Sequence, residues 1–374
     1  MIWIVLFVLL SIIYCEKKFH KTLITPASMM AISYIITILA AKIGNIYFNY
    51  FPISSRVYFI VLVSIGFAWI PSFIVPKQND KKSDIEMKFQ LSFCNKVYLF
   101  LLEIGLLIGL IFKLRNGAIA STSFEDNYMH GPFAHLLNLF CVITMFAMCV
   151  SEKNIYTISI IGFGFFLVFL SGVKYHVIFM FLTYVIKILY LGKRKDYIRI
   201  GLICFLGVFF IFFMNYFLSF LIRGIKSDKF FIFIINHFLM YISGGLVAFS
   251  ELLRGNGGVK SGFVSIDTVG INSTNVYSLI GELYLKHSVF SFINIFIISL
   301  IGYILFYYFI KQRNILNKQL LFIAYTIFSG VPLLLSFFGS YYGLLRTFEL
   351  PILALICCIL LQKNFGKKFL LMGR

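Results

Sequence analysis

The run FFIFIINHFLMYISGGLVAF, residues 230–249, lies within the one long segment, 223–287, that is neither a clear membrane span nor a short connector. An apolar run of about 20 residues can enter or cross a bilayer. Asn236, His237 and Ser243-Gly-Gly interrupt it, and non-helical backbone survives at membrane depth only where protein or water covers it. We therefore predict a partly re-entrant segment that lines a site on the outer face, since long connections are commonly functional. One more transmembrane helix followed by a loop is the alternative.

Composition decides the class of protein. The 374 residues are 60% hydrophobic and 13% charged, and the mean hydropathy is +0.94. Such a chain cannot be a water-soluble globule, so we predict an all-α integral membrane protein with one polytopic domain over residues 1–374. Apolar runs of about 17–25 residues predict about eleven spans. These are 1–15, 23–42, 57–75, 97–112, 134–150, 155–172, 177–192, 200–222, 288–310, 320–339 and 345–362.

Basic residues predict the orientation of these spans. Most of the 33 Lys and Arg residues fall in alternate loops, including the tail from residue 363. The positive-inside rule makes those loops cytoplasmic, with the N-terminus outside and 223–287 as a long extracytoplasmic loop. The net charge of +19 then reflects topology, so we expect no nucleic-acid partner. The first apolar run is expected to be a retained helix, because lysines follow it instead of preceding it.

Cationic side chains on the predicted outer face suggest a phosphate-binding site. The planar fork of arginine binds phosphate oxygens through two parallel hydrogen bonds. Each cation could also simply mark the interfacial end of a helix, but taken together the arginines favour a site. The candidates for binding are Arg223, Arg254, Arg346, Lys174 and His176.

A general base for a sugar hydroxyl is also available on this face. The candidates are Glu251, Glu282 and His287, in no fixed order. Glu282 could instead serve a helix end, and His287 could be an ordinary interfacial residue. Glu103 lies in the middle of a predicted span and is a functional candidate by its position, although a hydrogen bond to another helix explains it equally well. Histidine, cysteine and carboxylate spacings indicate no metal site, and we expect no cofactor.

Two short stretches resemble a known family. Tyr241-Ile-Ser-Gly-Gly-Leu-Val-Ala-Phe-Ser and Asn275-Val-Tyr-Ser-Leu-Ile-Gly-Glu-Leu-Tyr-Leu-Lys-His-Ser, with the predicted spans and enlarged outer loop, look like Wzy-type O-antigen and capsule repeat-unit polymerases. The likeness covers the whole chain as architecture but only these stretches as sequence. Lys286-His287-Ser288 stands where such polymerases tend to have Asp-Phe-Gly, so no family acid is assigned there.

The resemblance implies a metal-independent glycosyltransferase of the bacterial inner membrane. It would move a growing glycan from undecaprenyl pyrophosphate onto a new lipid-linked repeat unit, within a bundle related to C-type glycosyltransferases and O-antigen ligases. Its partners would be those lipid-linked oligosaccharides, the bilayer, and a chain-length regulator and flippase. A lipid-linked oligosaccharide flippase or an O-antigen ligase is the alternative. Sugars would stack on Tyr241, Tyr277 and Tyr284.

Overall fold

A computed structural model of the chain describes residues 1–76, 174–191, 230–255, 258–260, 263–265, 278–312 and 315–339, with isolated residues elsewhere. Contacts divide the chain into two compact units. Unit 1 comprises residues 1–81, 226–307 and 328–344, and unit 2 comprises the rest. One boundary, between residues 307 and 308, falls within the helix α13 (Ser291–Lys311). Each unit is described by itself below.

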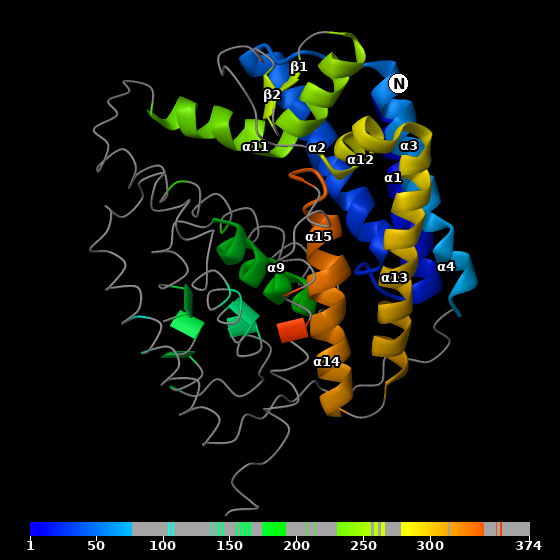
Figure 1. Cartoon of the computed structure of the whole chain (residues 1–374), viewed down its shortest axis with the longest axis vertical. Coiled ribbons are helices and arrows are strands. Elements are labelled where there is room, and N and C mark those ends of the chain that lie inside the picture. The colour runs from blue at the N-terminus through cyan, green and yellow to red at the C-terminus, as the bar shows by residue number, and fades with distance from the viewer. Residues whose placement is uncertain are drawn as a thin grey trace, which may run out of the picture. The chain divides into compact units, whose positions relative to one another are not determined.

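Three helices begin unit 1: α1 (Ile2–His20), α2 (Pro26–Phe48) and α3 (Ser55–Trp69). Local signals set their ends. The Thr25 and Ser54 side chains accept hydrogen bonds from the first turns of α2 and α3, which satisfies otherwise unpaired N–H groups. Lys21 and Asn49 adopt left-handed conformations that end α1 and α2. The chain therefore passes back and forth through unit 1 on short connections (Figure 1).

Proline divides the predicted span 57–75. α3 gives way at Ile70 to the short helix α4 (Pro71–Ile74), with Pro71 in its first turn. Proline lacks an N–H but is tolerated at a helix start, so the chain continues as a new helical turn. The apolar stretch Ser55–Ile74 as a whole remains long enough to cross a membrane.

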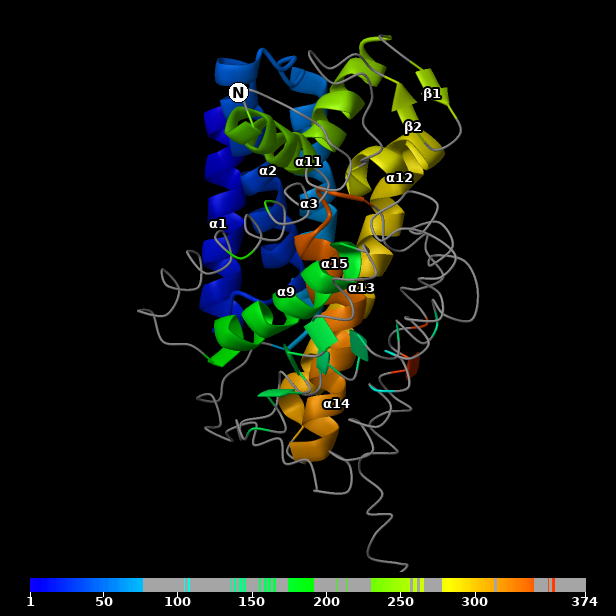
Figure 2. The same cartoon turned by 90° about the vertical axis from the view of Figure 1, so that its left-hand side faces the viewer.

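The predicted interruption of the 230–250 segment is wrong. α11 (Phe230–Leu253) runs as one helix through Ser243-Gly244-Gly245. It nevertheless changes direction along its length (Figures 1 and 2). Ser243 Oγ donates to the Leu239 carbonyl at 2.7 Å, and such back-bonding, like neighbouring Gly and Ser residues, is associated with bent helices. Ser243, Gly244 and Gly245 thus lie within a continuous but bent helix.

α11 packs mainly against α2. Leu239 and Met240 form a buried cluster with Ala40 and with Tyr50, which follows α2. The predicted outer loop 223–287 is therefore largely structured, since it contains α11, a hairpin and α12 (Leu279–His287). The hairpin pairs β1 (Gly258–Lys260) antiparallel with β2 (Phe263–Ser265), with Val259 opposite Val264. This short hairpin was not expected in an all-α chain.

α12 leads through the 3-10 turn Ser288–Phe290 into α13 (Ser291–Lys311). Hydrogen bonds fix the start of α12 to α2 and to the residues that follow α15 (Val331–Leu334). The Ile280 N–H donates to Tyr34 Oη at 3.1 Å, and the Leu279 N–H donates to the Ser336 carbonyl at 2.7 Å. These buried bonds connect segments that lie far apart in the sequence.

Unit 2 contains α9 (Lys174–Leu191) and α14 (Ile315–Tyr325). Tyr190 of α9, Phe309 near the end of α13 and Phe322 of α14 form a buried aromatic cluster. A π-helical turn, Thr326–Gly330, connects α14 to α15. Aromatic packing is therefore part of the described core of this unit, together with buried aliphatic residues of α9 such as Val185 and Ile186.

Three helical stretches among the described residues are long and apolar enough to cross a membrane: Pro26–Phe48, Ser55–Ile74 and Leu279–Lys311. They match the predicted spans 23–42, 57–75 and 288–310. The helical, membrane-compatible class is thereby confirmed. The count of about eleven spans stays a prediction, because several of them lie largely outside the described residues. These are 97–112, 134–150, 155–172, 200–222 and 345–362.

Candidate functional site

The last turns of α11 carry two predicted site residues as a direct ion pair. Arg254 Nη1 donates to Glu251 Oε1, and a spacing of three residues places both side chains on one helix face. The Glu251 side chain is 2% exposed and that of Arg254 34% exposed. The buried carboxylate therefore has the cationic partner that its burial requires, while the side chain of Arg254 stays partly exposed.

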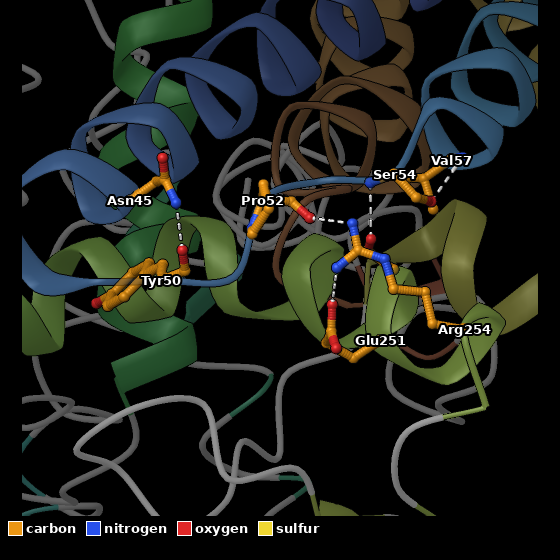
Figure 3. Close-up of polar contacts among 8 residues, drawn as sticks. Asn45, Tyr50, Pro52, Ser54, Val57, Glu251 and Arg254 are labelled. Atoms are coloured by element: carbon orange, nitrogen blue, oxygen red, sulfur yellow. Dashed lines mark hydrogen bonds and ion pairs between the residues drawn. The ribbon is translucent and has the colours of Figure 1, made fainter.

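The loop between α2 and α3 lies against this face of α11 (Figure 3). Arg254 Nη2 donates to the Pro52 carbonyl at 2.8 Å. The Ser54 N–H donates to Ser250 Oγ at 2.8 Å, while the Ser54 side chain caps α3. One arginine thus connects α11 to the loop, and a serine pair fixes the start of α3 beside it.

Tyr50 secures the same loop further back along α11. Its hydroxyl donates to Asn236 Oδ1 at 2.6 Å, and its carbonyl accepts from Asn45 Nδ2 at 2.5 Å. The side chain is 4% exposed, and burial raises the pKa of the Tyr50 phenol above its usual range. Tyr50 therefore remains a neutral hydrogen-bond donor, and the loop is held at both of its ends.

Arg254 retains the chemistry needed to bind an anion. A guanidinium has five N–H groups, and two of them serve Glu251 and Pro52. The others have no partner among the described residues. The fork is planar and two protein partners fix its orientation, and a guanidinium held in this way can offer its remaining N–H groups to an oxyanion such as phosphate.

Glu251 has a geometry suited to positioning Arg254. Its carboxylate is buried and its Oε1 accepts from the guanidinium, so Arg254 occupies one of the two oxygens that could take a proton from a substrate. Its assignment as a base stays a prediction. In this pair, a buried anion orients a partly exposed cation.

α12 carries the other two candidate bases. Glu282 lies in the first turn of this helix and pairs with Lys286 at 2.5 Å across one helical turn. His287 is the last residue of α12 and is exposed. α12 packs on α11, because the Tyr284 ring meets Phe249 edge-on at 5.8 Å between centroids. Both candidates therefore lie in the same unit as Arg254.

The tyrosines expected to stack on sugars are engaged in packing. Tyr284 also contacts Phe292, at 6.2 Å between ring centroids. Tyr241 stacks on Phe338, with 5.5 Å between ring centroids and 13° between the ring planes. The His237 ring centroid lies 4.8 Å from that of Tyr241. Both tyrosines are only partly buried. Their rings support α11 and α12, and a sugar could use only the faces that remain.

Five predicted binding residues cannot be placed beside Arg254. Arg223, Arg346 and Tyr277 lie outside the described residues, as does the mid-span candidate Glu103. Lys174 and His176 lie in the first turn of α9, which belongs to unit 2 and whose first residues are described by backbone only. The site assembled by the structure therefore consists of Glu251, Arg254 and the loop that meets them.

Sequence reasoning missed the loop residues Tyr50, Pro52 and Ser54, and it also missed a buried carboxylate, Glu16. No charge marks the loop, whose role comes from its backbone carbonyl and N–H groups. Glu16 did carry a signal, because it is the only acidic residue before Asp80 and it follows an apolar run. A lone carboxylate at a span end is a functional candidate.

Within the described residues, no three His, Cys, Asp or Glu side chains gather as metal ligands would. The chain matches no known protein family, no curated protein and no solved structure. The family resemblance and its implications thus stay predictions that rest on the residues themselves.

Proposed function

We propose that this protein is a Wzy-type polysaccharide polymerase of the bacterial inner membrane, and that Arg254 binds the pyrophosphate of a lipid-linked glycan. The observation that carries the proposal is the Glu251–Arg254 pair, in which a buried carboxylate orients an arginine whose side chain is one-third exposed. A membrane protein that transfers glycans from a lipid pyrophosphate needs such a cation at the bilayer surface.

The arrangement of unit 1 supports an outer position for this site. The N-terminus, the α2–α3 connection and the β1–β2 hairpin lie towards the same end of the unit (Figures 1 and 2). The positive-inside rule assigns all three segments to the outer face. The ion pair at the end of α11 is on this side, where undecaprenyl-linked repeat units would be presented.

The proposed reaction is a glycosyl transfer. A hydroxyl of the new repeat unit attacks the anomeric carbon of the growing glycan, the bond from that carbon to the phosphate oxygen breaks, and undecaprenyl pyrophosphate leaves. Arg254 stabilises the negative charge on the leaving oxygen, in place of a metal ion. Glu251, Glu282 or His287 accepts the hydroxyl proton, and of these His287 is the most exposed to an incoming substrate.

One observation favours the alternative, a lipid-linked oligosaccharide flippase. Transporters place ionisable residues inside their helical bundles, and Glu16 is fully buried in unit 1. Polymerase and flippase differ in what accumulates when the protein is lost. A strain without the polymerase still exports single repeat units, whereas a strain without the flippase exports none.

A gel of surface polysaccharide from a deletion strain tests the proposal. Complementation with the wild-type chain should restore a ladder of repeat lengths, whereas Arg254→Ala at matched expression should leave single units. An intact ladder in the deletion strain would contradict a polymerase. Loss of every surface unit would instead favour the flippase. Arg223→Ala and Arg346→Ala extend the test to the other predicted arginines.

A further inference from the structure

A second polar cluster lies near the end of α1, away from the α2–α3 loop that meets Arg254. Glu16 is fully buried and its carboxylate accepts three hydrogen bonds. Trp69 Nε1 donates to Oε1 at 2.8 Å and Tyr303 Oη donates to Oε2 at 2.6 Å. The Ser72 hydroxyl also donates to Oε1. Residues from α1, α3, α4 and α13 therefore meet at one carboxylate.

This carboxylate has no cationic neighbour at ion-pair distance among the described residues. The lysines at the same end of unit 1, Lys17, Lys18 and Lys21, are exposed. A buried carboxylate without a compensating charge is costly. Among the described residues, the titratable groups that face Glu16 are Tyr303, directly, and one histidine, through a hydroxyl.

That histidine is His20, which is 1% exposed. Its Nε2 lies 2.9 Å from Ser72 Oγ, so one hydroxyl bridges an imidazole and a carboxylate. The His20 ring is flanked by Tyr303 and Phe306, each with its centroid 5.9 Å away. These two aromatic rings pack against the imidazole.

We propose that Glu16, Ser72 and His20 form a proton-binding site that holds one exchangeable proton. In one arrangement His20 is an imidazolium, and its Nε2–H donates to Ser72, which donates to an ionised Glu16. In the other arrangement, the proton on His20 Nε2 has moved to Ser72 Oγ, and the original hydroxyl proton of Ser72 has moved to Glu16 Oε1. One N–H bond and one O–H bond have broken and two O–H bonds have formed, so that His20 is neutral and Glu16 is protonated. The proton moves as along a hydrogen-bonded chain, and the site is neutral in both arrangements.

Neutrality is the reason for binding one proton. Loss of that proton would leave a net negative charge buried among aromatic side chains, and a second proton would leave a net positive one. Three donors already occupy most of the lone-pair positions of the carboxylate, which leaves little room to coordinate a metal ion. The site is independent of the proposed polymerase reaction.

Infrared difference spectra of the purified full-length chain in detergent, recorded along a pH titration, test the proposal. The Glu16 band is identified as the one that Glu16→Gln abolishes, and the His20 band as the one that His20→Gln abolishes. In the wild type, both bands should change in intensity with pH at the same midpoint. Ser72→Ala should separate the two midpoints by at least a tenfold change in proton affinity, about one pH unit. Ser72→Thr, which keeps the hydroxyl, should keep them together.

A matched control is Glu251→Gln, which removes another buried carboxylate of unit 1 and should leave both bands unchanged. The proposal is overturned if the Glu16 band does not change with pH, or if Ser72→Ala titrates as the wild type does. Should Glu16→Gln or His20→Gln fail to fold, isotope-edited spectra of Ser72→Ala and Ser72→Thr still decide the outcome, since both keep the two titratable groups.

Discussion

Arg254 and Glu251 form an ion pair in which the carboxylate is buried and the arginine side chain is one-third exposed. The second Nη of Arg254 meets the Pro52 carbonyl at 2.8 Å. The arginine therefore has a fixed orientation and a partly exposed side chain. A freely rotating interfacial arginine would have no such fixed partners, and this difference leads to the next two predictions.

Replacing Arg254 by lysine keeps the charge but removes the planar fork. If the fork binds pyrophosphate, Arg254→Lys should lower the rate of polymer formation by at least about tenfold, a loss of about 1.4 kcal/mol. Arg56→Lys is the matched control, because Arg56 is an exposed arginine in the first turn of α3. Equal rates for the two variants would show that only charge matters at position 254.

The pair should also be visible in stability. Arg254→Ala leaves the Glu251 carboxylate buried without its cation, so it should destabilise the protein more than Glu251→Gln, which keeps a hydrogen-bond acceptor. The double variant should recover part of the loss, with a coupling energy of about 0.5–3 kcal/mol. Unfolding in detergent measures all four proteins, and additive losses would contradict the pairing.

Tyr50 should make stability depend on alkaline pH. Burial raises the pKa of its phenol, so the stabilisation is complete below the pKa of the unfolded phenol, about 10, and is lost as the pH rises above it. Tyr50→Phe, which loses the bond to Asn236, should be less stable at pH 8 by about 1 kcal/mol. The difference should shrink above pH 10. A constant difference across this range would refute the assignment.

Two glycines provide a packing test. A Cβ at Gly44 of α2 would overlap the Tyr50 ring, whereas a Cβ at Gly66 of α3 meets nothing within 4 Å. Gly44→Ala should therefore destabilise the protein by about 1–3 kcal/mol, and Gly66→Ala should be neutral or stabilising. Thermal unfolding distinguishes them. A harmless Gly44→Ala would mean that the Tyr50 ring is not held against α2.

Glu282 provides a test that separates packing from catalysis. Its pair with Lys286 spans one turn of α12, and the lysine is 60% exposed, so Glu282→Gln should cost less than about 0.5 kcal/mol of stability. If Glu282 is the base, the same change should lower polymer formation at least about 100-fold. Unchanged turnover in a stable variant would remove Glu282 from the candidates and leave Glu251 and His287.

The sequence was sufficient to predict the helical membrane class and the approximate positions of the apolar helices. Hydropathy placed the spans 23–42 and 288–310, because burial in lipid requires long apolar runs. It could not place their ends, since α2 continues to Phe48 and the last long helical stretch begins at Leu279. The left-handed Asn49 ends α2, and the Ser278 side chain caps the start at Leu279. Hydropathy does not report such capping residues.

The candidate site was predicted only in part. Arg254 and Glu251 were both predicted as site residues, but their pairing was not. A spacing of three residues allows an ion pair if the chain is helical there. Because we expected the helix to break at Ser243-Gly244-Gly245, the pairing was not predicted. Contacts such as Glu16 with Tyr303, which lie 287 residues apart, depend on tertiary packing that no local pattern encodes.

The most direct test of the central claim uses the purified full-length chain in liposomes, supplied with lipid-linked repeat units extracted from its own deletion strain. We expect a ladder of longer glycans on undecaprenyl pyrophosphate with the wild type, and single units only with Arg254→Ala. Repeat units that cross the bilayer without growing in length would contradict it and establish a transporter instead.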